Sequence, residues 1–176
     1  MGKFSEGLLN DEMILKNLTI CPGQTILDAG CGNGYMAIKF SKLVGDTGKI
    51  YALDSDRGLI ANLRKEIGKK SNIDAIVGDI TKRTALKDAS VDLVYLSTVF
   101  HIFPDTEIVC FENEINRILK PKAQLAIINI NKEDSPFGPP VEMRYSPEEL
   151  RQKLSFVPKK CIDVGKHFYM QLFIKR

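Results

Sequence analysis

The chain has 176 residues, which fits a single domain built around one hydrophobic core. Its composition of 44% hydrophobic and 27% charged residues is ordinary for a globular protein, and no apolar run approaches the ~20 residues that cross a membrane. The net charge of +3 is a weaker basic bias than nucleic-acid-binding proteins usually show, so a nucleic-acid substrate is only a minor alternative. Because the N-terminus lacks the apolar region of a signal peptide, we expect a cytoplasmic location.

Helical periodicity from Glu6 to Leu18 predicts an amino-terminal helix. A short apolar strand follows at 25–29, and the segment from 34 to 44 then has the apolar period of a second helix. Between them stand three glycines at alternate positions, Gly30, Gly32 and Gly34. Strand, glycine turn and helix form the first half of a nucleotide-binding unit, in which glycines let the backbone turn tightly and approach a ligand.

The spacing of the glycines distinguishes between ligands. A dinucleotide-binding fingerprint, G-x-G-x-x-G, would place its third glycine at position 35, where this chain has Tyr35. An NAD(P)-dependent oxidoreductase is therefore an alternative that the sequence disfavours. A non-catalytic module that binds the cofactor or a partner protein is a second alternative.

Two further strands end in acidic residues. The strand at 49–53 is followed by Asp54, where a carboxylate can accept hydrogen bonds from both ribose hydroxyls of an adenosine. Ser55 and Asp56 are better placed than Asp54 to cap the helix predicted at 57–68, which leaves Asp54 for a ligand. The strand at 74–77 leads in the same way to Asp79.

Further strands at 93–96 and 124–130, with a helix at 106–119 between them, complete an alternating pattern. Such alternation predicts a parallel sheet with helices on both faces. In sheets of this kind ligands bind beyond the carboxyl ends of the strands, at the switch point between the first and fourth strands. Five polar or glycine positions fall at these ends: Asp28, Gly30, Asp54, Asp79 and Ser97.

The sequence D-x-G-x-G-x-G from Asp28 to Gly34 resembles motif I of the class I S-adenosylmethionine-dependent methyltransferases. The resemblance extends over residues 20–130 and is nearest to the ubiquinone/menaquinone methyltransferase branch. It implies a single domain over residues 1–176 with a Rossmann-like, doubly wound α/β fold. The seven strands would have the order 3-2-1-4-5-7-6, with the last strand antiparallel. It also implies S-adenosylmethionine as cofactor, S-adenosylhomocysteine as product and a small-molecule acceptor.

The resemblance also implies roles for the residues at the strand ends. In this family the acid that corresponds to Asp79 accepts from the adenine amino group, while the next residue, Ile80, faces the ring. The cofactor-binding residues expected on this basis are Asp28, Gly30, Cys31, Gly32, Asn33, Asp54, Ser55, Gly78, Asp79, Ile80 and Ser97. One departure is Pro121-Lys122-Ala123, which stands where the family usually has Pro-Gly-Gly, so we expect the backbone of that turn to differ.

Two segments remain for the acceptor. Residues 131–147 form a long, proline-containing loop, which we interpret as a lid whose side chains Glu142, Arg144 and Tyr145 bind the substrate. The amino-terminal residues 1–20 are expected to form a helical cover. After the loop, Ser146 as N-cap, Pro147 at the first helical position and Glu149 in a capping box predict the last helix.

Methyl transfer from a sulfonium needs a base only if the acceptor must lose a proton. His101 lies in an apolar segment after the fourth strand, so either a catalytic role or a buried structural one is compatible with its position. His167 begins the seventh strand, and it would reach the rim of the site if the strand at 161–164 runs parallel to the others. The spacing of the four cysteines predicts no metal site, and Cys110 and Cys161 are expected in the core.

Overall fold

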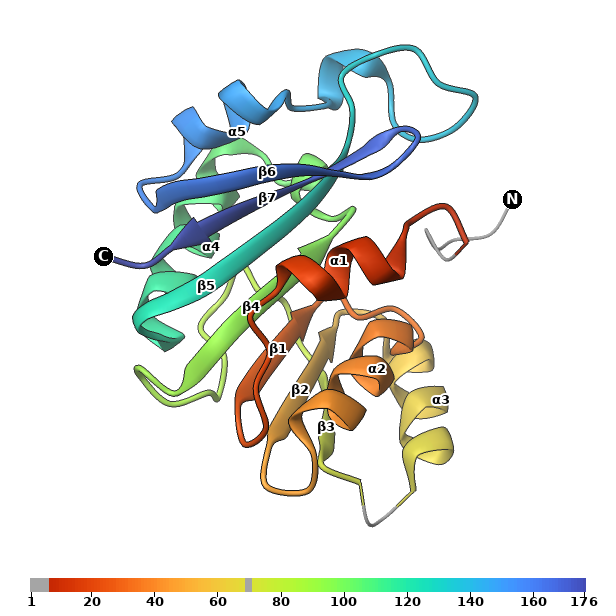
Figure 1. Cartoon of the computed structure of the whole chain (residues 1–176), viewed down its shortest axis with the longest axis vertical. Coiled ribbons are helices and arrows are strands. Elements are labelled where there is room, and N and C mark those ends of the chain that lie inside the picture. Colours follow the sequence, from red (N-terminus) through yellow and green to blue (C-terminus); the bar gives the residue numbers. More distant parts are fainter. Residues whose placement is uncertain (1–6, 69–70) are drawn as a thin grey trace.

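The computed structural model describes residues 7–68 and 71–176. Seven strands form one sheet in the order β3-β2-β1-β4-β5-β7-β6, which confirms the predicted α/β topology (Figure 1). The strands are β1 (Thr25–Ala29), β2 (Lys49–Asp54), β3 (Ile73–Val77), β4 (Val91–Ser97), β5 (Leu119–Ile130), β6 (Val157–Gly165) and β7 (Phe168–Ile174). The helices are α1 (Asp11–Asn17), α2 (Tyr35–Val44), α3 (Arg57–Ile67), α4 (Asp105–Ile118) and α5 (Pro147–Lys153), with short 3-10 turns at Phe100–Ile102 and Val141–Met143.

Six strands run in one direction and the seventh runs against them. Strands β1 to β5 pair in parallel, whereas β7 pairs antiparallel with both β5 and β6. It follows that β6 is parallel to β5, as the sequence analysis assumed for the strand before His167. The carboxyl ends of β1, β2, β3 and β4 therefore meet at one edge of the sheet, where ligands bind in folds of this type.

Helices cover both faces of the sheet because successive strand residues point to opposite sides. In β1, Ile26 belongs to the apolar cluster that α1, α2 and α3 complete, and Leu27 belongs to the cluster under α4 and α5. Leu93 and Val94 of β4 divide in the same way. The two helical layers are seen on opposite sides of the sheet in Figure 1. No helix in the described part of the chain is long and apolar enough to cross a membrane.

The amino-terminal helix is shorter than its periodicity predicts. Its predicted start, Glu6, lies outside the described residues, but Gly7 already forms a turn with φ of 77°. The helix begins only after Asn10, whose side chain accepts a hydrogen bond from the Met13 amide at 3.0 Å. The prediction was wrong here because a capping side chain at Asn10 overrides the apolar pattern before it.

Two helix starts and two cysteine positions test the local predictions further. The capping box of Ser146 and Glu149 is present, and Asp56 caps α3 through the amides of Gly58 and Leu59. Both assignments are confirmed.

Cys110 of α4 and Cys161 of the edge strand β6 are exposed, so their expected burial was wrong. An apolar side chain on an outer helix face or an edge strand need not pack inward.

The turn near the start of β5 has a left-handed residue. Lys122 has φ of 64°, a conformation that favours glycine, although a lysine stands there. The turn coincides with an irregular register between β4 and β5, where Val91 faces Leu119 but Leu93 already faces Gln124. Strand β5 therefore starts five residues before the predicted strand and contains this turn as a bulge.

Lys122→Gly should raise the free energy of unfolding by about 0.5–1 kcal/mol, because relief of left-handed strain exceeds the entropy that a glycine adds to the unfolded chain. Urea denaturation measures the change. As a matched control, Lys159→Gly in β6, where φ is not positive, should lower stability by about 0.5–1 kcal/mol. Equal destabilisation by both substitutions would contradict strain at Lys122.

Candidate functional site

The glycine turn between β1 and α2 is fastened to the end of β2. The amides of Gly30 and Cys31 both donate to the Leu53 carbonyl, at 2.7 and 3.0 Å, and the Gly32 amide donates to Asp54 Oδ2 at 2.9 Å. Gly30 has φ of 73°, and a Cβ there would lie 2.5 Å from Cγ2 of Val99. Only glycine therefore fits between the turn and the segment that follows β4.

Asp54 occupies the centre of this arrangement. Its Oδ2 accepts from the Gly32 amide and its Oδ1 accepts from the Asp56 amide, both at 2.9 Å. These two bonds fix the carboxylate at the end of β2. A carboxylate oxygen can accept more than one hydrogen bond, so both oxygens can still receive donors from a ligand.

Two cavities meet at Asp54. The first, of about 330 Å³, lies over the glycine turn and the ends of β1 and β4, and the second, of about 300 Å³, lies over the end of β3. Gly30, Asp54 and Val99 line both. Every predicted cofactor-binding residue lines at least one of them: Asp28, Gly30, Cys31, Gly32, Asn33, Asp54 and Ser97 the first, and Ser55, Gly78, Asp79 and Ile80 the second.

The lining of these two cavities is acidic. Six carboxylates contribute, and no lysine, arginine or histidine among the described residues lines either cavity. The acids are Asp11, Asp28, Asp54 and Asp56 in the first cavity, with Asp79 and Glu107 added by the second. Such a field attracts a cation and repels a polyanion. The cavities therefore suit S-adenosylmethionine, which carries a sulfonium and an ammonium, better than a dinucleotide with its diphosphate.

Asp28 is the most deeply buried of these acids. Burial raises the pKa of its carboxyl from an ordinary 3.8 to about 7; the Ala37 amide at the start of α2 opposes the rise, and the charge of Asp54 adds to it. The residue is only 3% exposed. A group held near neutrality in this way gains a negative charge most readily when a cationic ligand group lies beside it.

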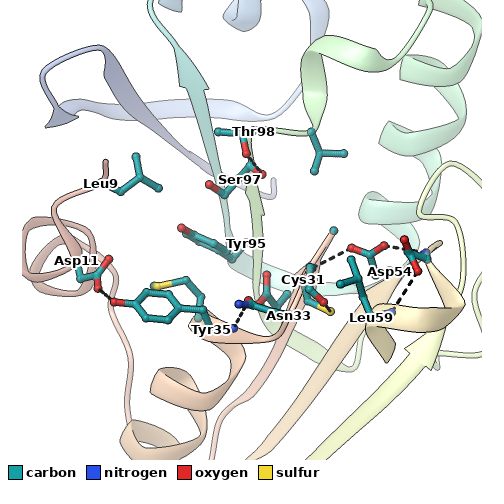
Figure 2. Close-up of a pocket in the computed structure, with 16 residues that line it drawn as sticks. Leu9, Asp11, Cys31, Asn33, Tyr35, Asp54, Leu59, Tyr95, Ser97 and Thr98 are labelled. Carbon is teal, nitrogen blue, oxygen red and sulfur yellow. Dashed lines mark hydrogen bonds between the residues drawn. The ribbon is translucent and has the colours of Figure 1, made fainter. Parts of the chain in front are cut away.

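The amino-terminal segment forms one side of the first cavity. Leu9 and Asp11 line it, and Figure 2 shows Asp11 joined to Tyr35 of α2. The Tyr35 hydroxyl donates to Asp11 Oδ2 at 2.5 Å, and Lys39 Nζ lies 3.3 Å from the same oxygen. This contact ties the start of α1 to the start of α2.

A third cavity, of about 560 Å³, gathers all the remaining predicted residues except His167. His101, Glu142, Arg144 and Tyr145 line it, together with Lys132, Met143, Glu149, Gln152 and Lys153. Neighbouring residues of one segment line this cavity and the two cofactor cavities. His101 lines the third cavity, Val99 lines both cofactor cavities, and Ile102 lines the second of them. Burial, and then the charge of Arg144, lower the pKa of His101 below its ordinary value, so its imidazole is neutral at pH 7.

Arg144 is turned toward its own loop. Its guanidinium donates to the carbonyls of residues 131, 133, 137 and 139 and to Ser135 Oγ, the last at 2.9 Å. The side chain is only 4% exposed. All these partners belong to the predicted lid loop, so the guanidinium determines the shape of that loop, and any effect on an acceptor is exerted through the loop.

His167 also packs against this loop. Its ring meets Phe137 edge-on at 5.6 Å, and its Nδ1 lies 3.5 Å from Glu133 Oε1. The strand before it is parallel, as the prediction of a place at the rim required, but His167 lines none of the three cavities.

Several lining residues were not anticipated from the sequence. In the two cofactor cavities these are Leu9, Asp11, Tyr35, Met36, Leu53, Asp56, Leu59, Tyr95, Thr98, Val99, Ile102, Phe103 and Glu107. A signal existed for one of them. Tyr95 stands two residues before Ser97 and therefore shares its face of β4, and it places a hydroxyl within the apolar run 93–96.

The strand order, the glycine turn and the acidic cavities together define the class of Rossmann-like methyltransferases. A family model described as "Methyltransferase domain" matches residues 26–122. The chain belongs to this methyltransferase family, and its cofactor is S-adenosylmethionine. A solved structure of a SAM-dependent methyltransferase from Aquifex aeolicus has a TM-score of 0.85 and 28% identity, covering 99% of this chain and 94% of that one.

Two curated relatives have named substrates. A 2-phytyl-1,4-naphtoquinone methyltransferase from Trichormus variabilis is 29% identical over 127 residues, which cover 69% of this chain and 53% of that protein. A demethylmenaquinone methyltransferase from Staphylococcus aureus is 25% identical over 123 residues, which cover 70% and 50%. The chain thus spans about half the length of the curated relatives it matches.

Asp28→Asn should stabilise the ligand-free protein at high pH and weaken cofactor binding. Because the folded-state pKa of about 7 lies above the ordinary 3.8, the folded protein binds the proton more tightly, so stability falls as the pH rises through this range. At pH ~8 the variant should gain about 1–3 kcal/mol, and the gain should shrink toward pH ~4. Urea unfolding at both pH values, with calorimetric titration of S-adenosylmethionine, measures both effects. A gain independent of pH would contradict the assignment.

Arg144→Ala should lower the free energy of unfolding by about 1–3 kcal/mol, because several buried carbonyls lose their donor. Affinity for S-adenosylmethionine should stay nearly unchanged, since Arg144 lines neither cofactor cavity. Arg144→Lys should restore little of the lost stability, because one ammonium cannot replace the several N–H donors of the planar guanidinium. Lys132→Ala, which removes only a partly exposed ion pair with Glu149, is the control and should cost less than about 1 kcal/mol. Collapse of cofactor binding would assign the loop to the donor site.

Proposed function

We propose that this protein transfers a methyl group from S-adenosylmethionine to a small-molecule acceptor bound in the cavity that His101, Glu142 and Tyr145 line. The observation that carries the proposal is the presence of two acidic cavities at the glycine turn and a separate third cavity, with neighbouring residues of the segment 99–102 lining all three. The bound cofactor supplies an electrophilic methyl group. The protein orients donor and acceptor in a site that excludes water.

On the donor side, Asp54 accepts hydrogen bonds from the ribose hydroxyls, and Asp79 accepts a hydrogen bond from the adenine amino group. The surroundings of Asp79 favour its ionised form. Partial burial raises the pKa of its carboxyl, but hydrogen bonds from the Thr81 hydroxyl and amide and the charge of Lys82 outweigh burial, so the pKa lies below its ordinary value. The carboxylate is therefore ionised and can accept. Ile80, which is 4% exposed, supplies an apolar neighbour for the ring.

On the acceptor side, His101 serves as the base. Its imidazole is neutral at pH 7, and its buried Nδ1 has no hydrogen-bond partner in the described part of the chain. It can therefore take a proton from a hydroxyl or an activated carbon of the acceptor. Glu142 and Tyr145 contact the acceptor, and Arg144 holds the loop that carries them. His167 supports the same loop from the contact with Phe137.

The relatives favour an aromatic acceptor. Both curated proteins described above are named for naphthoquinone-type substrates. Tyr145 gives the acceptor cavity an aromatic side chain, and its ring is held edge-on against the buried Phe100 at 5.4 Å. We infer a ring-bearing acceptor whose reacting atom is activated by loss of a proton to His101. The acidic lining of the donor cavities disfavours the alternative of a nicotinamide-dependent oxidoreductase, and NADH should fail to displace S-adenosylhomocysteine.

His101→Gln should reduce turnover at least ~100-fold, the usual loss on removal of a general base, and leave affinity for S-adenosylmethionine within about twofold. Transfer of labelled methyl groups to reduced demethylmenaquinone measures turnover, and calorimetry measures affinity. Because the pKa of His101 is lowered, the rate of the unsubstituted protein should fall only at acid pH, as His101 gains a proton, and this limb should vanish in the variant. His167→Gln is the matched control, with a much smaller loss. Normal turnover of His101→Gln would refute the assignment.

A further inference from the structure

Thr98, the first residue after β4, has a left-handed backbone that its side chain disfavours. Its φ is 57°, and a β-branched residue rarely adopts a positive φ. Among the described residues, Ala89 and Lys122 are the only other non-glycine residues with a positive φ. Neither of them lines any of the three cavities, whereas Thr98 lines the first. Backbone strain beside a cavity is typical of positions with a function.

Contacts on several sides hold Thr98 in this conformation. Its amide donates to the Ile128 carbonyl of β5 at 2.8 Å, and its hydroxyl donates to the Ser97 carbonyl at 2.7 Å (Figure 2). The next residue, Val99, packs so closely on the glycine turn that a Cβ at Gly30 would lie 2.5 Å from its Cγ2. A strained conformation persists where its surroundings fix it in this way. Of the two hydrogen bonds, only that of the hydroxyl belongs to a side chain, so a substitution can remove it.

The left-handed residue turns the chain between the cavities. Ser97 ends the strand and lines the first cavity, Val99 lines both cofactor cavities, and His101 lines the third. Val99 already has φ of −115° and ψ of −35°, in the helical region, and the 3-10 turn begins after it. The change of direction from extended strand to 3-10 turn is therefore concentrated at Thr98. An extended φ at this position would continue the line of β4 and carry His101 elsewhere.

We propose that Thr98 is a positioning residue, whose left-handed backbone, supported by its own hydroxyl, places the His101 imidazole in the third cavity. The consequence for methyl transfer rests on the proposed function, in which His101 is the base. The placement itself has a separate signature. Nδ1 of His101 is buried without a hydrogen-bond partner among the described residues, and burial, more than the charge of Arg144, lowers the pKa of the imidazole. A displaced ring would be more hydrated, so its pKa would rise toward the ordinary value.

Thr98→Val keeps the β-branched shape but removes the hydroxyl that supports the left-handed backbone. The backbone should then leave the left-handed region, and the pKa of His101 should rise. NMR titration of the ligand-free protein measures this pKa, since the chain has only two histidines and His167→Gln assigns their signals. Turnover should fall at least ~10-fold, because the base is no longer held within reach of the acceptor. Should Thr98→Val fail to fold, Thr98→Ala removes the same hydroxyl and carries the same expectation.

Thr98→Gly separates the backbone from the side chain. Glycine adopts a positive φ without strain, so this variant should keep the pKa of His101 and recover most of the turnover that Thr98→Val loses. It should melt about 2–4 °C above the unsubstituted protein, because the strain is relieved. Ala89→Gly is the matched control. It relieves the same kind of strain at a residue that lines none of the cavities, so the protein should melt higher with the pKa of His101 unchanged.

The inference is overturned by an unchanged pKa of His101 in folded Thr98→Val, or by an equal rise in Thr98→Gly or Ala89→Gly. Loss of turnover in Thr98→Gly with the pKa unchanged would also overturn it, because the hydroxyl would then act on a ligand directly. The titration needs neither cofactor nor acceptor, so its outcome is independent of the proposed function. A raised pKa in Thr98→Val with normal turnover would confirm the placement and instead contradict His101 as the base.

Discussion

The hydrogen bond from the Gly32 amide to the Asp54 carboxylate, at 2.9 Å, joins the two strand ends on which the site depends. It fastens the turn after β1 to the end of β2. Without glycine the turn could not approach Val99, and α2 could not begin where it does. The position of the turn then determines where the two donor cavities open and which residues line them. A local backbone constraint thus defines the place of the ligand.

The protein maintains this site at a cost in stability. Asp28 is buried with its pKa near 7, and three oxygens of the first cavity wall lack partners among the described residues. Each feature disfavours the ligand-free fold and favours a cationic ligand, which is a common trade between stability and function. The acidic cavities contrast with the overall net charge of +3, so the sign of the local field reflects the site and not the composition.

The donor side could be predicted from the sequence because its residues stand at the ends of strands, where apolar runs, glycines and acids mark position by spacing alone. The strand order came from the family resemblance. Tyr95 escaped prediction because a tyrosine inside a buried strand resembles any core residue until its pairing with Asp28 is known. Arg144 was predicted to face an acceptor, but its bonds run to carbonyls up to thirteen residues away, and these depend on how the loop folds. Contacts between distant segments were the part that sequence patterns could not supply.

The central claim is that Asp54 and the glycine turn form the binding site for S-adenosylmethionine. Calorimetric titration of Asp54→Ala tests it most directly, with Asp56→Ala as a control that removes a neighbouring acid and the cap of α3. Asp54→Ala should lose at least ~10-fold in affinity, because charge-assisted bonds to the ribose are lost, and the control should lose less. Circular dichroism should show both variants folded. Unchanged affinity in a folded Asp54→Ala protein would contradict the account.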